Sequence, residues 1–306
     1  MVEDHRGGEL SPGAREWFAT PGSFTSLGSH KLELTGRSSG ELVEQVVAAV
    51  QNLLIYDVVA EPFYGVTLSA AAADEVNLRP VADILDRVLA LDPRPLTAPR
   101  APEHRVAARC HNYAKTTVAF LRAHGVPARS RCGFGACFRP GWFEDHWVAE
   151  YWNDDTRRWV MVDAQLDETW RRMLGYEGNW LDITPDEFVT AGRAWQGWRS
   201  GTADASRYGF SGIDEHGAHW IAGNLRLDTT ALHKIEMLPW DVWGAGWEPH
   251  QDPPEDLSIF DTLAALTADP DAHLGEIHDR CATDPRVHMP GTVFNVLRQR
   301  EEQVAT

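Results

Sequence analysis

The chain has 306 residues, 43% of them hydrophobic and 24% charged, and a formal net charge of -17 at pH 7. Its 28 Lys and Arg residues are outnumbered by 45 Asp and Glu residues, which argues against nucleic acid as a partner because phosphate binding needs clustered basic side chains. The longest apolar stretches are well short of the roughly 20 residues of a membrane span, so neither a transmembrane helix nor a membrane partner is expected.

Residues 1–30 are predicted to form a flexible N-terminal arm. They are rich in Gly, Ser and Pro and show no sustained periodicity. The segment also lacks a basic start followed by an apolar run, so it contains neither a recognisable secretory signal nor a lipidation motif. Export is therefore not expected, and a cytoplasmic location is predicted.

Two amphipathic helices are predicted at the start of a main domain that spans residues 31–250. A capping-box pattern, Ser38 with Glu41, precedes apolar residues that recur every three or four positions through Leu54. A second pattern of this kind covers residues 81–89 and ends at the Pro-rich stretch 92–99. Both helices should bury one apolar face.

A third helix is predicted from about Cys110 to the sequence Gly125-Val126-Pro127, where a glycine precedes a helix-breaking proline. Residues 128–136 alternate small or apolar residues with Arg129 and Arg131, which predicts a strand with one solvent-facing side. Further along, residues 185–195 have a helical pattern. Residues 251–306 are predicted to form a helical C-terminal extension with helices at 257–266 and 293–304.

Residues 146–163 read as a β-hairpin, since two runs rich in aromatic and β-branched residues flank a polar turn. A turn centred on Asp154 and Asp155 would place Glu150 opposite Trp159 and His146 opposite Asp163. Directly opposed residues have Cβ atoms about 4.5 to 5.5 Å apart, close enough for a carboxylate to accept an imidazole hydrogen bond and fix the ring's tautomer. His146 and Asp163 are thus predicted to act as a base and the group that orients it.

Cys110 is the best-placed candidate for a nucleophile among four cysteines that are too few and too scattered for a disulfide framework. At the start of a helix, unpaired N–H groups and the positive end of the dipole favour a thiolate, and a nearby imidazolium would favour it further. The alternative is a small buried hydrophobe, the usual role of a lone helical cysteine. Cys132, Cys137 and Cys281 fit that role better. No metal site is predicted, because His216 and His219 lack a recognisable third ligand.

The stretch from about residue 105 to 167 resembles the bacterial transglutaminase-like proteins of the papain-like superfamily. The sequence Cys110-His111-Asn112-Tyr113-Ala114 is similar to the start of that family's nucleophile helix, and residues 121–129 are similar to its helix-to-strand passage. His146 with Glu150, and Trp159 followed by Asp163, resemble its His and Asp strands. The resemblance implies an α+β fold, in which the nucleophile helix of a papain-like transglutaminase core packs on an antiparallel sheet. It also implies a Cys-His-Asp triad that needs no metal or organic cofactor.

Three functions remain open on this evidence. The chain is expected to act on an amide- or thioester-bearing substrate through an acyl-enzyme, either as a hydrolase such as a peptidase or as an acyltransferase with an amine acceptor. A catalytically silent binding protein of the same fold is the third. Trp147, which adjoins His146, and Asn112, which lies beside Cys110, are predicted to contact the substrate.

Overall fold

The structure is a computed structural model that describes residues 9–249 and 251–304. By their internal contacts the residues divide into two compact units. Unit 1 comprises residues 1–130 and 148–183, and unit 2 comprises residues 131–147 and 184–306. The chain therefore crosses between the units at three points. Two of these lie inside strands, between Ser130 and Arg131 in β3 (Ala128–Gly135) and between Trp147 and Val148 in β4 (Phe143–Asn153).

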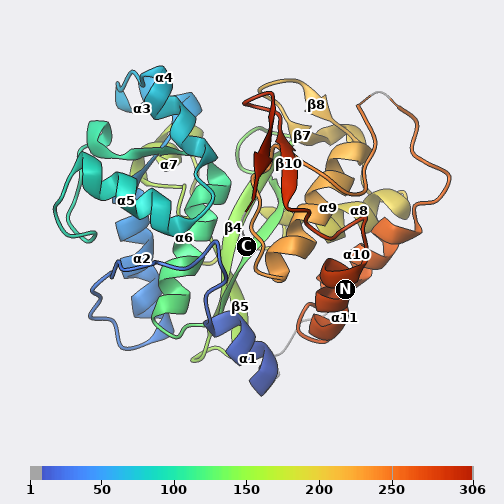
Figure 1. Ribbon diagram of the computed structural model, residues 1–306, viewed down its shortest axis with the longest axis horizontal. Helices are drawn as coiled ribbons and strands as arrows, with labels where there is room; N and C mark the ends of the chain where they lie inside the picture. The colour runs from blue at the N-terminus through green and yellow to red at the C-terminus, as the bar shows by residue number, and fades with distance from the viewer. Residues whose placement is uncertain (1–8, 250, 305–306) are drawn as a thin grey trace. The chain divides into compact units, whose positions relative to one another are not determined.

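Three of the predicted helices form the helical layer of unit 1: α2 (Ser39–Leu53), α5 (Val81–Leu91) and α6 (Cys110–Ala123). The predicted capping box is present at α2, where the Ser38 hydroxyl accepts the Glu41 N–H at 3.2 Å. Helix α6 packs against both α2 and α5 (Figure 1). The sequence prediction of all three helices is confirmed.

The hydrophobic core of unit 1 joins these helices to a β-hairpin made by β4 (Phe143–Asn153) and β5 (Arg158–Val162). Buried side chains of α6 share one cluster with those of the hairpin: Val118, Ala119, Phe120, Leu121, Ala149, Tyr151, Val160 and Val162. Each large apolar side chain buried in this way contributes about 1.5 to 3 kcal/mol. The helix that begins at Cys110 therefore packs on antiparallel strands, and the α+β class with this packing is confirmed.

The first 30 residues are less loosely ordered than the sequence suggests. Residues 1–8 lie outside the described residues, but α1 (Pro12–Ala19) is a regular helix capped by Ser11. Phe18 of α1 and Phe24 after it are fully buried. Two large aromatic side chains anchor this segment, although their spacing is too irregular to reveal a helix. The domain boundaries at residues 30 and 250 stay predictions.

The remaining elements of unit 1 are short. Strands β1 (Leu54–Tyr56) and β2 (Val106–Ala108) pair in parallel, with Tyr56 beside Ala108. This pairing brings the residues after β1 close to the start of α6, because α6 begins two residues after β2 ends. The helices α3 (Ala60–Tyr64), α4 (Ala70–Ala73) and α7 (Glu168–Leu174) complete the unit.

The predicted register of the hairpin is wrong by two residues. Trp152 pairs with Trp159 and Glu150 with Met161, whereas the prediction set Glu150 opposite Trp159. The ladder ends at the pair of Ala149 and Val162, so His146 and Asp163 are not directly opposed in it. The turn is longer than expected because the Asn153 side chain accepts the N–H groups of Asp155 and Thr156, at 3.0 and 3.1 Å.

Strand β3 (Ala128–Gly135) forms as predicted, but its solvent-facing side does not exist. Every residue of β3 is buried, including the two arginines. Arg129 pairs with Glu150 at 2.5 Å in unit 1, and Arg131 pairs with Asp228 at 2.9 Å in unit 2. The alternating pattern of the sequence assigns both arginines to solvent. Because each has an acidic partner from another part of the chain, β3 can bury both charged side chains.

Strands β6 (Phe188–Thr190), β7 (Tyr208–Phe210) and β8 (Glu215–His216) of unit 2 belong to a mixed sheet in the strand order β6-β3-β4-β7-β8, in which β5 pairs with β4. Helices α8 (Ala191–Arg199), α9 (Ala218–Leu232) and α10 (Ser258–Ala268) pack on one another (Figure 1). The predicted helix over 185–195 is thus correct only in its second half. At Gly133, an added Cβ would lie 2.3 Å from the Val189 carbonyl, so glycine allows β3 and β6 to pair.

The C-terminal residues are only partly helical. Helix α10 confirms the prediction for 257–266, and α11 (Leu274–Thr283) follows it. The predicted helix over 293–304 is wrong, since β10 (Thr292–Asn295) and β11 (Arg300–Gln303) form a hairpin beside β9 (Asp241–Val242). Val293 and Asn295 are buried while Phe294 is exposed, a period of two that favours a strand.

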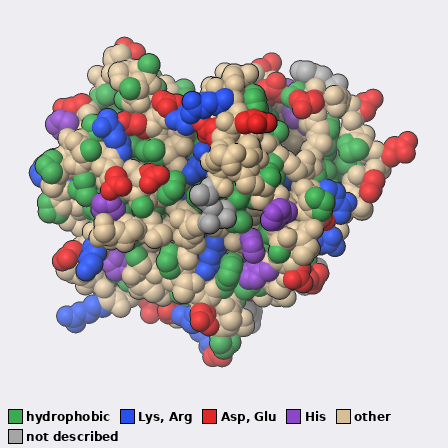
Figure 2. Space-filling view, viewed as in Figure 1, with side chains coloured by type: hydrophobic (Ala, Val, Ile, Leu, Met, Phe, Trp, Pro, Cys, Tyr) green, Lys and Arg blue, Asp and Glu red, His purple; other side chains and the backbone are tan. Residues whose placement is uncertain are grey.

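No helix in the described part of the chain is long and apolar enough to cross a membrane. Acidic and basic side chains are interspersed on the face of the molecule that Figure 2 shows.

Candidate active site

Cys110 is the first residue of α6 and is buried, with 7% of its surface exposed. Arg109 is the N-cap residue, and its N–H donates to the Asn112 side-chain oxygen at 3.0 Å. The Asn112 amide group donates to the Leu78 carbonyl at 3.4 Å. Asn112 therefore stabilises the helix start, where the positive end of the helix dipole lies.

An ion pair that the sequence did not reveal holds the residue before Cys110. The Arg109 guanidinium donates from Nε and Nη2 to the Asp57 carboxylate, with three distances of 3.0 to 3.1 Å. Asp57 directly follows β1, which pairs with β2, and this pairing explains how residues 52 positions apart meet. A bidentate pair of this kind fixes orientation as well as charge.

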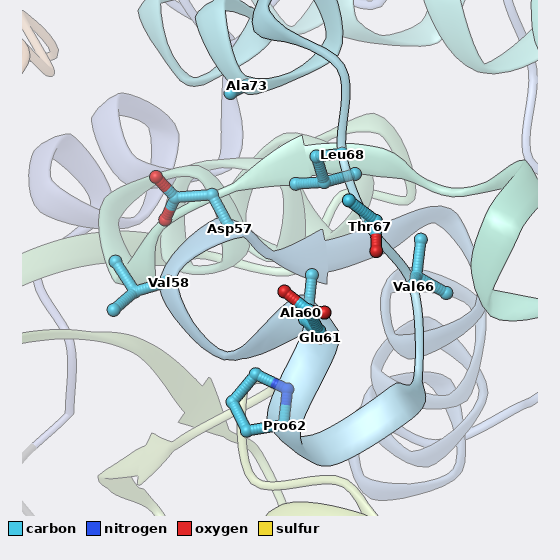
Figure 3. Close-up of a pocket in the computed structure, with 9 residues that line it drawn as sticks. All are labelled: Asp57, Val58, Ala60, Glu61, Pro62, Val66, Thr67, Leu68 and Ala73. Atoms are coloured by element: carbon cyan, nitrogen blue, oxygen red, sulfur yellow. The ribbon is translucent and has the colours of Figure 1, made fainter.

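Asp57 also lines a pocket of about 290 Å³ in unit 1 (Figure 3). Residues of α3 and the segment after it form the other walls, and Glu61, Val66 and Thr67 are among them. Figure 3 shows Asp57 on one side of the pocket and Val66 and Thr67 on the opposite side. The Asp57 carboxylate is thus held by Arg109 at the margin of a concave surface.

His111, the second residue of α6, carries no charge at neutral pH in this structure. Burial lowers its pKa well below 6.5, and the neighbouring charges of Lys115, Arg109 and Arg79 lower it further. Lys115 is itself fully buried and donates to the Arg79 carbonyl. The positive charge near the start of α6 therefore comes from Arg109 and Lys115 instead.

Asp163 follows β5 in unit 1 and is 2% exposed. Its N–H donates to the Trp180 carbonyl at 2.8 Å, and its Oδ1 accepts the Gln165 N–H at 2.9 Å. These two bonds hold the backbone and the carboxylate in one orientation. A buried carboxylate anchored by a backbone donor is suited to orient a partner group.

His146 lies on β4 in unit 2 and is 3% exposed. Its ring contacts Phe138 edge-on, with centroids 4.7 Å apart, and lies 6.2 Å from the Phe188 ring. Gly135 makes room for this packing, because an added Cβ would lie 2.6 Å from the Phe138 ring. The imidazole is thus held by aromatic side chains, which restrict its rotation and its access to water.

The predicted site residues are divided between the units. Cys110, Asn112 and Asp163 belong to unit 1, whereas His146 and Trp147 belong to unit 2. Trp147 is buried, and its Nε1–H has no hydrogen-bond partner among the residues that the structure describes. Within residues 9–249 and 251–304 no group of three or more His, Cys, Asp or Glu side chains is arranged to hold a metal.

Asp145, beside His146, is a titratable group with a raised pKa. Its Oδ1 accepts the Asn224 amide N–H at 2.9 Å. Desolvation by burial raises the pKa of Asp145 to about 6, although the hydrogen bond from Asn224 opposes the rise. Because the folded value lies above the unfolded one, the stabilisation is complete below about pH 4 and is lost as the pH rises through 6.

We therefore expect Asp145→Asn to remove part of the pH dependence of stability. Between about pH 4 and pH 7.5 the free energy of unfolding of the wild type should fall by about 2 kcal/mol relative to that of the variant. This is less than the full pKa shift of Asp145 would give, because the residue is only partly buried and solvent screens its charge. Urea unfolding at several pH values measures the difference. Asp155→Asn, which changes an exposed carboxyl group in the turn between β4 and β5, is the control and should leave the slope unchanged. Parallel curves for the wild type and Asp145→Asn would contradict the assignment.

Comparison with known proteins agrees with the family resemblance. Residues 88–164 match the core model of the transglutaminase-like superfamily, and Cys110, His146 and Asp163 all lie inside the match. A search of curated proteins found no match. Among solved structures, the chain is similar to a Cytophaga hutchinsonii protein described as a "putative cysteine protease", with 17% identity and a TM-score of 0.33. That alignment covers 60% of this chain and 50% of the other protein's chain.

Proposed function

We propose that this chain, which contains a transglutaminase-like core, is a cysteine-dependent acyl-transfer enzyme that acts on an amide or a thioester. The observation that carries the proposal is the position of Cys110, a buried thiol at the first residue of helix α6 within the matched segment. A helix N-terminus favours the thiolate, which is the nucleophilic form. We assign His146 as the base and Asp163 as the residue that orients it.

The reaction follows from these roles. The Cys110 sulfur attacks the carbonyl carbon, and His146 accepts the thiol proton. The new C–S bond forms as the C–N bond of an amide, or the C–S bond of a thioester, breaks, and the proton passes from His146 to the leaving group. Water or an amine then attacks the acyl carbon, and His146 takes the proton of the attacking group. The C–S bond to Cys110 breaks as the new C–O or C–N bond forms, and the proton on His146 returns to the Cys110 sulfur.

Two features of the chain support the assignment of His146 and Asp163. Both are almost fully buried, and each is held by its own unit, His146 by aromatic rings and Asp163 by backbone hydrogen bonds. The hairpin register differs from the predicted one by two residues, an even number that leaves alternate strand faces unchanged. Strand geometry is therefore still compatible with the two side chains on one face.

The substrate contacts and the cellular setting follow from the same proposal. Trp147 is proposed to wall the acyl pocket, and Asn112 to contribute by fixing the helix start at Cys110. A nucleophilic thiol must stay reduced, and none of the four cysteines forms a disulfide in the described part of the chain, so we propose a reducing cytoplasm as the setting. The acceptor is proposed to be water or an amine, which makes the enzyme a hydrolase or an acyltransferase.

A reporter acyl donor tests this function and distinguishes the two reactions. After incubation with p-nitrophenyl acetate, peptide mass mapping should find an acetyl group on Cys110 and not on Cys132, Cys137 or Cys281. Addition of methylamine should shift the product from acetate to N-methylacetamide if the enzyme is an acyltransferase, and should leave acetate dominant if it is a hydrolase. An unacetylated Cys110 together with no release of p-nitrophenolate above that of Cys110→Ala would contradict the proposal and favour a catalytically silent binding protein.

A further inference from the structure

The ion pair between Arg109 and Asp57 is placed to influence the proposed nucleophile. Arg109 precedes Cys110 directly, and its guanidinium is held in one position by three hydrogen-bond distances of 3.0 to 3.1 Å to Asp57. Their side chains are 21% and 11% exposed, so solvent screens the pair much less than a surface pair. A fixed, weakly screened charge beside a titrating thiol changes the balance between thiol and thiolate.

The electrostatic coupling between Arg109 and Cys110 is visible from the side of the arginine. Burial alone would lower the pKa of Arg109, but the hydrogen bonds and charge of Asp57 raise it, and Tyr56 and Cys110 in their ionised forms raise it further. Coupling between two sites is reciprocal, so the Arg109 charge favours the thiolate of Cys110 to the same degree. The negative charge of Asp57 acts in the opposite direction and disfavours the thiolate of Cys110.

We propose that Arg109 and Asp57 are a pair of positioning residues that together set the charge state of Cys110, with Arg109 favouring the thiolate and Asp57 limiting that effect. The inference rests on the proposed function, because the thiol concerned is the proposed nucleophile. The fork of Arg109 on Asp57 keeps the positive charge beside the start of α6. Asp57 in turn prevents a full unit of positive charge from acting on the thiol.

Other charged and titratable groups surround the start of α6 and remain unchanged in the test below. On α6 itself they are His111, Tyr113 and Lys115, and on the elements packed around it they are Tyr56, Tyr64, Glu75, Arg79, Arg105 and Asp167. Their combined effect sets the pH midpoint of thiolate formation at Cys110 in the wild type. The difference between two variants at positions 57 and 109 cancels that background.

Two single variants that break the same ion pair should move Cys110 in opposite directions. Arg109→Gln removes the positive charge and exposes the thiol to Asp57, so the pH midpoint of thiolate formation should rise by about 0.5 to 1 unit. Asp57→Asn leaves Arg109 uncompensated, so the midpoint should fall by a similar amount, about 0.5 to 1 unit. A purely structural role would move both variants in the same direction, because both lose the bridge.

The midpoint is measured in the full chain from the ultraviolet absorbance of the thiolate, as a difference from Cys110→Ala at each pH. Glu61→Gln is the matched control. Glu61 lines the same pocket as Asp57, but it is exposed and has no hydrogen bond to Arg109 among those that the structure gives for the described residues. In this variant the pH midpoint of thiolate formation at Cys110 should shift by less than about 0.2 units. Arg109→Lys keeps the charge and should remain within about 0.3 units of the wild type.

The double variant Asp57→Asn/Arg109→Gln completes the cycle and should return the midpoint to within about 0.3 units of the wild type, because both charges are gone. Shifts of the same sign in the two single variants, or no shift in either, would overturn the inference. The proposed function is judged separately by the wild-type midpoint. A value near the roughly 8.5 of an ordinary thiol would count against the nucleophile, while opposite shifts would still establish the role of the pair.

Discussion

Cys110→Ala should lower the rate of acyl transfer from p-nitrophenyl acetate by at least about 10³-fold, because the acyl-enzyme cannot form without the thiol. The residual rate should be that of general ester hydrolysis by surface groups. Initial-rate kinetics at saturating donor measure the effect. The fold should survive the substitution, since alanine fits the space of the buried Cys110 side chain at the helix start. Alanine also has a high helix propensity.

Cys132→Ala provides the control for the loss of a buried thiol. Cys132 is fully buried in β3, and its N–H donates to Asp228 at 2.9 Å, a bond that alanine preserves. This variant should keep the wild-type rate within about twofold, because its thiol has no assigned role. Equal rates in Cys110→Ala and Cys132→Ala would show that any acyl transfer proceeds elsewhere and would contradict the assignment of the nucleophile.

Asp228→Asn should destabilise unit 2 by about 3 to 5 kcal/mol, the largest effect on stability that we expect from one substitution. Asp228 is fully buried and receives bonds from Arg131 Nε at 3.0 Å, Arg131 Nη2 at 2.9 Å and the Cys132 N–H. The neutral amide cannot balance the buried guanidinium, and its NH2 group faces donors. Urea unfolding followed by tryptophan fluorescence measures the loss.

Asp182→Asn is the matched control because Asp182 also forms a two-bond pair with an arginine, Arg158, but in an exposed setting. The side chains of Arg158 and Asp182 are 42% and 40% exposed, so water can solvate Arg158 when the carboxylate is lost. The free energy of unfolding should therefore fall by less than about 1 kcal/mol. Similar losses for the two variants would contradict the view that burial makes the Arg131 pair important.

Local patterns predicted the elements that position the candidate site. Helix α6 was predictable because its end before Gly125 carries a sequence signal, and Gly125 does adopt a φ of +73°. The capping box at Ser38 and the apolar periodicity of α5 are local in the same way. These signals depend on residues within one or two turns of each other, so tertiary contacts did not override them.

Features that depend on distant residues could not be predicted. The register of the β4–β5 hairpin was missed because the Asn153 side chain extends the turn, and a centred two-residue turn fits the sequence equally well. Arg131 was assigned to solvent because its partner Asp228 lies 97 residues away. Asp57, which holds Arg109, lies in no motif and approaches it only through the parallel pairing of β1 with β2.

The pH-dependent rate of iodoacetamide alkylation at Cys110, in the wild type and in His146→Ala, tests the central claim most directly. Peptide mapping separates Cys110 from the other cysteines, among which burial raises the pKa of Cys281 to about 12 and makes it a slow internal reference. We expect that Cys110 alone reacts rapidly below about pH 7 and that His146→Ala removes this reactivity. A Cys110 that reacts no faster than the reference cysteines, and that is unaffected by His146→Ala, would contradict it.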